Sequence, residues 1–194
     1  MTIRGLSAIV LGAIGMTAFA APQAQAAITV VGNGLARSCY ESAEFGGDAG
    51  GAIATCTYAL ETAALPVRDR AATYINRGIL KARSDDPTGA LGDYNQGLEL
   101  NANLGEGYVD RGAVMILFQR YDDALKDINK GIDMGAQKPE IAYYDRAIVD
   151  EALGNVRGAY EDYKKAVEIA PDFGLASEQL ARFKVVVHKG SDGT

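Results

Sequence analysis

A short phrase with a tyrosine, an arginine and a small residue occurs three times in this 194-residue chain, at almost constant spacing. The small residues that end the phrase, Gly78, Gly112 and Ala147, are 34 and 35 positions apart. Twelve residues after each stands an alanine, and four residues later a large side chain: Ala90 and Tyr94, Ala124 and Ile128, Ala159 and Tyr163. A period of this length predicts stacked helix-turn-helix units, because one such unit cannot bury its apolar face alone.

Helical spacing inside the repeats supports this interpretation. The second half of every unit carries apolar residues at i, i+3 and i+7, which form one stripe on a helix: Leu91, Tyr94 and Leu98; Leu125, Ile128 and Ile132; Tyr160, Tyr163 and Val167. Pro87 and Pro139 suit the first position of a helix. We therefore expect three units, over 71–104, 105–138 and 140–173.

Two further features of the repeat are predicted to be structural. The small residues allow two antiparallel helices to cross closely, so Gly112→Leu should cost about 1–3 kcal/mol through overpacking. An aspartate follows each arginine by sixteen residues, in the pairs Arg77 and Asp93, Arg111 and Asp127, and Arg146 and Asp162. Hairpin geometry places the members of each pair close together, which favours one ion pair in each unit over a catalytic pair of carboxylates.

Residues 71–173 resemble tetratricopeptide repeats, in the variant with Asn/Asp-Arg-Gly in the first helix. Tyrosine replaces the family's tryptophan at Tyr74, Tyr108 and Tyr143, and Ala147 replaces glycine in the third unit. The resemblance implies an all-α fold, a right-handed superhelix of antiparallel helix hairpins with a concave groove lined by the first helices. It also implies a protein that binds other proteins or peptides.

Carrying the family pattern over by position gives the residues expected to face the groove: Ile75, Ile79, Val109, Ala113, Ile116, Tyr144 and Ile148. Most are aliphatic, so the clamp that some family members use for a peptide's terminal carboxylate is not supported. An apolar groove favours a hydrophobic peptide or helix as the ligand. The alternative is that the chain's own segments fill it, either residues 27–31 or the end of the last helix.

The segment 27–70 is expected to hold a leader and a degenerate fourth hairpin. Cys56 takes the position of the large buried residue, and the midpoint between Cys39 and Cys56 falls within the glycine cluster 46–51. The two cysteines should therefore face each other and form a disulfide worth roughly 3 kcal/mol. A redox or metal-binding pair is the alternative, but it lacks a Cys-x-x-Cys spacing and a nearby histidine.

At the C-terminal end, residues 174–194 are expected to form a capping helix and a tail. Apolar residues recur between Phe173 and His188, and polar ones can cover the outer face of such a helix. The last residues, from Gly190 onward, read as a frayed tail.

The first 26 residues resemble a secretory signal peptide. Arg4 precedes an uncharged apolar run, and small residues at 24–27 suit cleavage after Ala26. A retained membrane anchor is the alternative, but the run is short and diluted by glycines. Export and a disulfide agree with each other, so we expect a periplasmic location, with secretion as the alternative and no stable membrane insertion after cleavage.

Chemistry is not expected from this chain. Its single histidine, His188, has no obvious partner, and motifs for a nucleophile, phosphate or metal site are missing from the sequence. The net charge of −6 and pI near 4.8 disfavour nucleic acid as a partner. We therefore predict no enzyme, cofactor or metal, and a scaffold that binds a peptide or protein. The alternative function is a self-associating component of a cell-envelope assembly.

Overall fold

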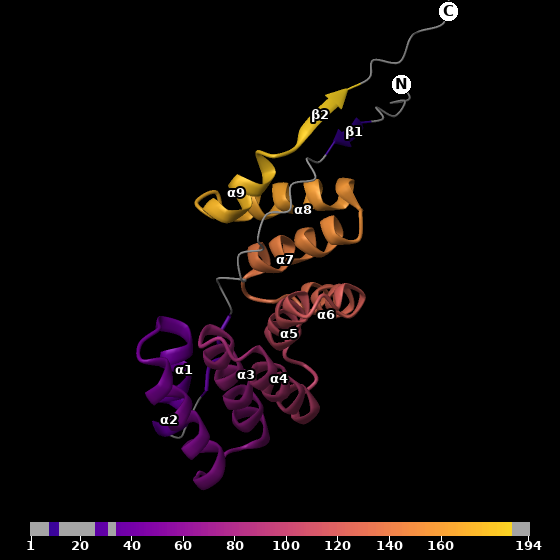
Figure 1. Cartoon of the computed structure of the whole chain (residues 1–194). Helices are drawn as coiled ribbons and strands as arrows, with labels where there is room; N and C mark the ends of the chain where they lie inside the picture. The colour runs from indigo at the N-terminus through magenta and orange to yellow at the C-terminus, as the bar shows by residue number, and fades with distance from the viewer. Residues whose placement is uncertain (1–7, 12–25, 31–33, 188–194) are drawn as a thin grey trace, which may run out of the picture.

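The computed structural model describes residues 8–11, 26–30 and 34–187. Within these ranges the chain forms helices stacked in chain order and two short strands (Figure 1). The elements are β1 (Ala8–Leu11), α1 (Gly34–Phe45), α2 (Ala49–Thr62), α3 (Val67–Arg83), α4 (Pro87–Leu100), α5 (Gly105–Leu117), α6 (Tyr121–Asp133), α7 (Pro139–Ala152), α8 (Val156–Ile169), α9 (Gly174–Leu180) and β2 (Lys184–Val187).

Consecutive helices pair as hairpins, and each hairpin packs on the next. The pairs are α3 with α4, α5 with α6, and α7 with α8, preceded by the pair α1 and α2. The turn inside each repeat contains one residue with left-handed backbone: Asp85 (φ 61°), Gln119 (φ 57°) and Gly154 (φ 79°). Only the third unit uses glycine there, although glycine adopts this conformation at the lowest cost.

The close crossing predicted at the small residues is present. A Cβ added to Gly78 would lie 2.6 Å from the ring of Tyr94, and one added to Gly112 would lie 2.7 Å from Ile128. Both neighbours are fully buried. The two helices of a unit therefore approach as closely as they do because the first helix has no side chain at the crossing point.

Two buried apolar clusters form the core, one from residues of α1 to α5 and one from residues of α5 to α9. Contacts run mainly between neighbouring helices, as expected for a solenoid. An ion pair also links two segments that are far apart in the sequence: Lys138 Nζ lies 3.4 Å from Glu44 Oε1. This ion pair joins the end of α1 to the residue before α7.

The predicted disulfide is present in the α1–α2 hairpin. Cys39 and Cys56 are bonded and fully buried, with their Cα atoms 5.0 Å apart. Gly46 and Gly47 carry positive φ angles in the turn between them. The terminal hairpin is thus covalently closed at a position where the other units place a large side chain.

The C-terminal helix is shorter than expected. We predicted a helix from Phe173 to His188, but α9 ends at Leu180, and Lys184–Val187 forms β2. The run Val185 to Val187 explains the difference, because β-branched residues favour extended backbone. His188 and the tail lie outside the described residues.

Strand β1 pairs with β2 in antiparallel orientation, so the all-α expectation holds for the helical body of the described chain but not for its ends. β1 lies within the segment expected to be a signal peptide, and the rest of that segment up to residue 25 lies outside the described residues. In the described part of the chain, every helix is too short or too polar to cross a bilayer.

Candidate functional site

Two neighbouring positions of the repeat behave differently in the structure. One is the arginine row, formed by Arg77, Arg111 and Arg146. The other, one residue earlier, is the amide–carboxyl row, formed by Asn76, Asp110 and Asp145. Adjacent residues on a helix are about 100° apart around its axis, so the two rows face different neighbours.

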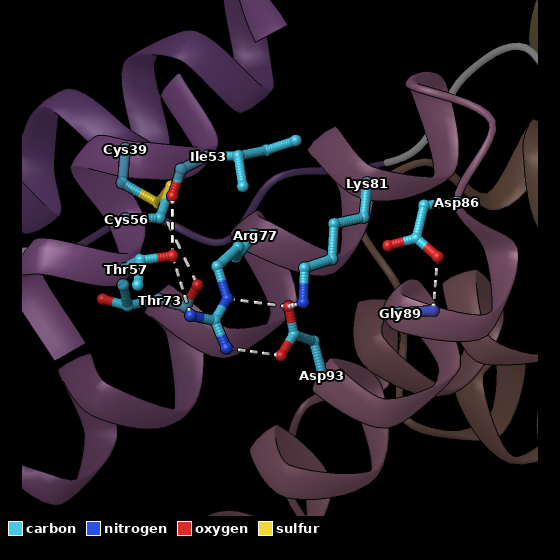
Figure 2. A network of polar contacts seen from close by, with 10 residues as sticks. All are labelled: Cys39, Ile53, Cys56, Thr57, Thr73, Arg77, Lys81, Asp86, Gly89 and Asp93. Atoms are coloured by element: carbon cyan, nitrogen blue, oxygen red, sulfur yellow. Dashed lines mark hydrogen bonds and ion pairs between the residues drawn. A yellow bond between two sulfur atoms is a disulfide. The ribbon is translucent and has the colours of Figure 1, made fainter. Parts of the chain in front are cut away.

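The arginine row joins each unit to itself and to the unit before it. Figure 2 shows Arg77 donating two hydrogen bonds to the carboxylate of Asp93 on α4, at 2.8 and 2.7 Å. The remaining guanidinium nitrogen donates to Thr57 Oγ1 on α2, at 3.0 Å. Lys81 Nζ also lies 2.9 Å from the carboxylate. Arg77 therefore holds α3 against both α4 and the preceding hairpin.

The other two arginines repeat this arrangement. Arg111 binds Asp127 through two nitrogens and donates to Asn95 of the preceding unit at 2.9 Å. Arg146 binds Asp162 in the same way and donates to Asn129 at 2.7 Å.

Each guanidinium also lies 5.2–5.5 Å from the ring centre of the tyrosine three residues before it. The predicted ion pairs are confirmed, and the structure adds their link across the unit boundary.

The amide–carboxyl row is buried but has unequal partners. Asn76 is fully buried, and both the oxygen and the nitrogen of its side-chain amide pair with the backbone of Ile28. The Ile28 N–H donates to Asn76 Oδ1, and Asn76 Nδ2 donates to the Ile28 carbonyl, each at 2.7 Å. This is the pairing that one strand offers another, here supplied by a side chain on a helix.

Asp110 and Asp145 occupy the same position in the next two units. One oxygen of Asp110 accepts a hydrogen bond from the Ala26 backbone, and Oδ2 has no partner. Neither oxygen of Asp145 has a partner, and its residue is 1% exposed. Burial raises the pKa of Asp110 well above its usual range and raises the pKa of Asp145 to about 8. Both sites can accept donors that the described chain does not supply.

Residues 26–30 form a stretch without helix or strand that lies against α1 and α3 (Figure 1). Ile28 lies at Asn76 and Ala26 lies at Asp110, so two residues of the segment span one unit of the solenoid. Ala27, Ile28 and Val30 are buried in the same apolar cluster as α1 and α3. The structure thus shows a stretch of polypeptide held by this face of the first helices.

The seven residues predicted to line the groove are all buried. Ile75 packs against Gly97 of α4 and Gly107 of α5, and Val109 packs against Gly131 of α6. Ile79 belongs to the first apolar cluster, and Ile116, Tyr144 and Ile148 to the second. Ala113 is 1% exposed. The structure therefore buries these residues between helices, most of them in one or the other of two apolar clusters, and their contact with a partner remains a prediction.

The sequence-based reasoning missed the amide–carboxyl row, although its signal was present. Asn76, Asp110 and Asp145 recur at the period of the repeat, directly before each arginine. A polar residue that recurs inside an otherwise apolar helix face requires a partner, because an unpaired buried polar group is costly. That requirement points to a hydrogen-bond partner outside the repeat.

No family model matches the chain. Among curated proteins, it is 28% identical over 107 residues to a TPR repeat-containing protein of Methanocaldococcus jannaschii, covering 53% of this chain. It is 32% identical over 89 residues to human serine/threonine-protein phosphatase 5, covering 46% of this chain. The chain spans only 18% of the length of each of these relatives.

Solved structures show the same architecture. MamA superposes with a TM-score of 0.59 at 21% identity, covering 73% of this chain and 80% of that protein. YrrB, described as a TPR protein with an unusual peptide-binding site, gives 0.56 at 25% identity, covering 64% and 62%. The second TPR domain of human RPAP3, solved with an HSP70 peptide, gives 0.54 at 19% identity, covering 60% and 97%. The helix hairpins of this chain therefore have the tetratricopeptide-repeat fold, and the chain is similar to tetratricopeptide-repeat proteins.

Proposed function

We propose that this protein is an interaction scaffold that holds an extended segment of a partner protein along the amide–carboxyl row. The observation that carries the proposal is the double hydrogen bond between Asn76 and the backbone of Ile28. Backbone recognition of this kind tolerates many sequences, while neighbouring apolar walls select side chains. Burial of Ile28 and Val30 beside Asn76 supports an apolar segment as the ligand.

The charge of the row supports a neutral or basic partner segment. A basic group near Asp110 and Asp145 would favour their ionised forms, which offer only acceptors, whereas an acidic peptide would add to the effect of Glu106 on Asp110. The peptides bound to the RPAP3 domains, SGPTIEEVD and SRMEEVD, end in acidic sequences. We therefore propose a ligand chemistry different from the one in those complexes.

The seven predicted apolar positions enter this proposal as the walls of the groove, beside the polar row that holds the backbone. We place the protein in an oxidising compartment, the periplasm, because the disulfide supports an exported protein. Catalysis has no part in the proposal. No group of three or more His, Cys, Asp or Glu side chains is arranged for a metal ion within the described ranges.

The test uses the whole chain with two substitutions that weaken the packing of residues 26–30; we call this variant the loosened chain. Ile28→Gly combined with Val30→Gly removes two buried side chains that hold residues 26–30 in place. A labelled synthetic peptide with the sequence of residues 27–31, blocked at both ends, is then titrated and followed by fluorescence anisotropy. We expect the loosened chain to bind this peptide at least about tenfold more tightly than the unchanged chain, because the site is vacated.

Adding Asn76→Ala to the loosened chain should weaken peptide binding by about tenfold, the loss of two hydrogen bonds of roughly 1 kcal/mol each with partial compensation by water. Asn103→Ala, which alters an exposed asparagine, serves as the matched control and should change nothing. A loosened chain that binds no peptide, or binds equally well with and without Asn76, would refute the proposed site.

A further inference from the structure

Asp110 lies beside the bond at which the leader is expected to be cut. Its carboxylate accepts the Ala26 N–H, and the peptide bond between Ala26 and Ala27 follows directly. Ala24 and Ala26 give this bond the small residues that leader-cleaving peptidases require three residues and one residue before the cut. The expected cleavage site is therefore one residue away from the backbone group that contacts the buried carboxylate of Asp110.

The surroundings of Asp110 favour a cation. Asp110 is 2% exposed, and its Oδ2 has no hydrogen-bond partner. When ionised, Asp145 and Glu106 raise the pKa of the Asp110 carboxyl, and Arg83 lowers it. Arg83 itself donates to the Ala43 carbonyl on α1. A buried carboxylate with two acidic neighbours is stabilised by an ammonium group that supplies both a charge and up to three donors.

We propose that Asp110 is the binding site for the α-ammonium group that forms at Ala27 when the chain is cut after Ala26. A leader-cleaving endopeptidase hydrolyses the Ala26–Ala27 amide with one water. The C–N bond breaks, the water oxygen becomes part of the Ala26 carboxylate, and the Ala27 nitrogen takes up the protons to become an ammonium. The new end lies one residue, about 3.8 Å along the chain, from the N–H that it replaces at Asp110.

Processing then leaves the segment in place, so a partner segment has to displace it to reach Asn76. Residues 27–30 keep their pairing with Asn76 and their buried side chains, and the ammonium replaces the lost Ala26 donor. The cut also removes β1 and, with it, the partner of β2. Asp145, with both of its oxygens unpartnered, is left beyond the new end of the segment.

The first measurement is the intact mass and N-terminal sequence of the protein after expression of the full-length gene in an exporting bacterial host. We expect a chain that begins at Ala27. A chain that begins at any other residue overturns the proposal, because no ammonium would then form next to Asp110.

The second measurement is the pKa of the Ala27 α-amino group in the processed protein, from the pH dependence of its acylation rate. A carboxylate partner should raise this pKa by about one unit above the ordinary 7.7–8.0. Asp110→Asn should return it to the ordinary range, and Asp133→Asn, at an exposed carboxyl, should leave it raised.

An ordinary α-amino pKa in the unchanged processed protein overturns the proposal without any variant. So does a raised pKa that survives Asp110→Asn in a variant with unchanged helicity. Asparagine already occupies the equivalent position at Asn76, and circular dichroism checks that the variant is folded. Neither measurement depends on peptide binding, so this proposal and the proposed function can fail separately.

Discussion

The arginine row and the amide–carboxyl row sit one residue apart in every repeat, yet only the first is satisfied in the same way three times. Arg77, Arg111 and Arg146 each bind an aspartate of their own unit and an acceptor of the unit before. In the other row, Asn76 is fully paired, Asp110 half paired and Asp145 unpaired. A position that is satisfied from within the repeat is scaffold, whereas one that needs donors from outside it is suited to binding.

Breaking the arginine row should have the largest effect. Arg111→Ala removes two bonds to Asp127 and one to Asn95, and leaves a mostly buried carboxylate without its cation. We expect a loss of about 3–5 kcal/mol in the free energy of unfolding, because an uncompensated buried charge is costly. Chemical denaturation followed by circular dichroism measures it, with exposed Arg157→Ala as the control. A loss below about 1 kcal/mol would show that the row is not structural.

An intermediate effect, of opposite sign, is expected from Asp145→Asn. The folded-state pKa of Asp145 is about 8, above the ordinary value near 3.9. Between these values the unfolded chain releases a proton that the folded chain keeps, so ionisation favours unfolding increasingly as pH rises from 4 to 8. Asparagine does not titrate, so the variant should be more stable than the unchanged chain at pH 8, on the order of 1–3 kcal/mol, and about equal at pH 4.

Thermal unfolding of the full chain at pH 4, 6 and 8 tests this prediction. Asp150→Asn is the comparison, because Asp150 is on the same helix and burial also raises its pKa, but it accepts a hydrogen bond from Asn155. A stability difference for Asp145→Asn that shrinks as pH rises would contradict the assigned burial of an uncompensated carboxyl.

The smallest loss of stability should come from removing only the hydrogen bond that links one unit to the next. Asn95→Ala removes the acceptor for one nitrogen of Arg111 and leaves the pair with Asp127 intact. We expect a loss of roughly 0.5–1.5 kcal/mol, since the freed N–H lies at an exposed bond and can reach water. If denaturation shows a loss as large as that of Arg111→Ala, then the hydrogen bond to Asn95, and not the ion pair with Asp127, provides most of the stability.

Much of the scaffold could be predicted from the sequence because its contacts depend on residue spacing within a single helix hairpin. The pairing of Arg77 with Asp93 and of Cys39 with Cys56 follows from equal distance to a turn. Such contacts require only an antiparallel hairpin, and the spacing between arginine and aspartate recurs in all three repeats. The same reasoning gave the close crossings at Gly78 and Gly112.

The proposed binding face was harder to predict because it depends on how the units pack. Spacing along a helix places Ile75 on an apolar face but does not tell whether the next unit or a ligand covers it. In the structure, α4 and α5 cover it at Gly97 and Gly107. The C-terminal helix was overestimated for a different reason, since the pattern of apolar residues between 173 and 188 does not separate a helix from a strand once valines follow one another.

The acceptors used by the arginine row also determine where the array stops growing. Asn95 and Asn129 each follow the large buried residue of a second helix and receive the arginine of the next unit. In the third unit that place, after Tyr163, is taken by Lys164, a cation half exposed beside Glu168. An arginine from a further repeat would meet a like charge there. The third unit thus lacks the acceptor that the first two units offer to the arginine of the next one.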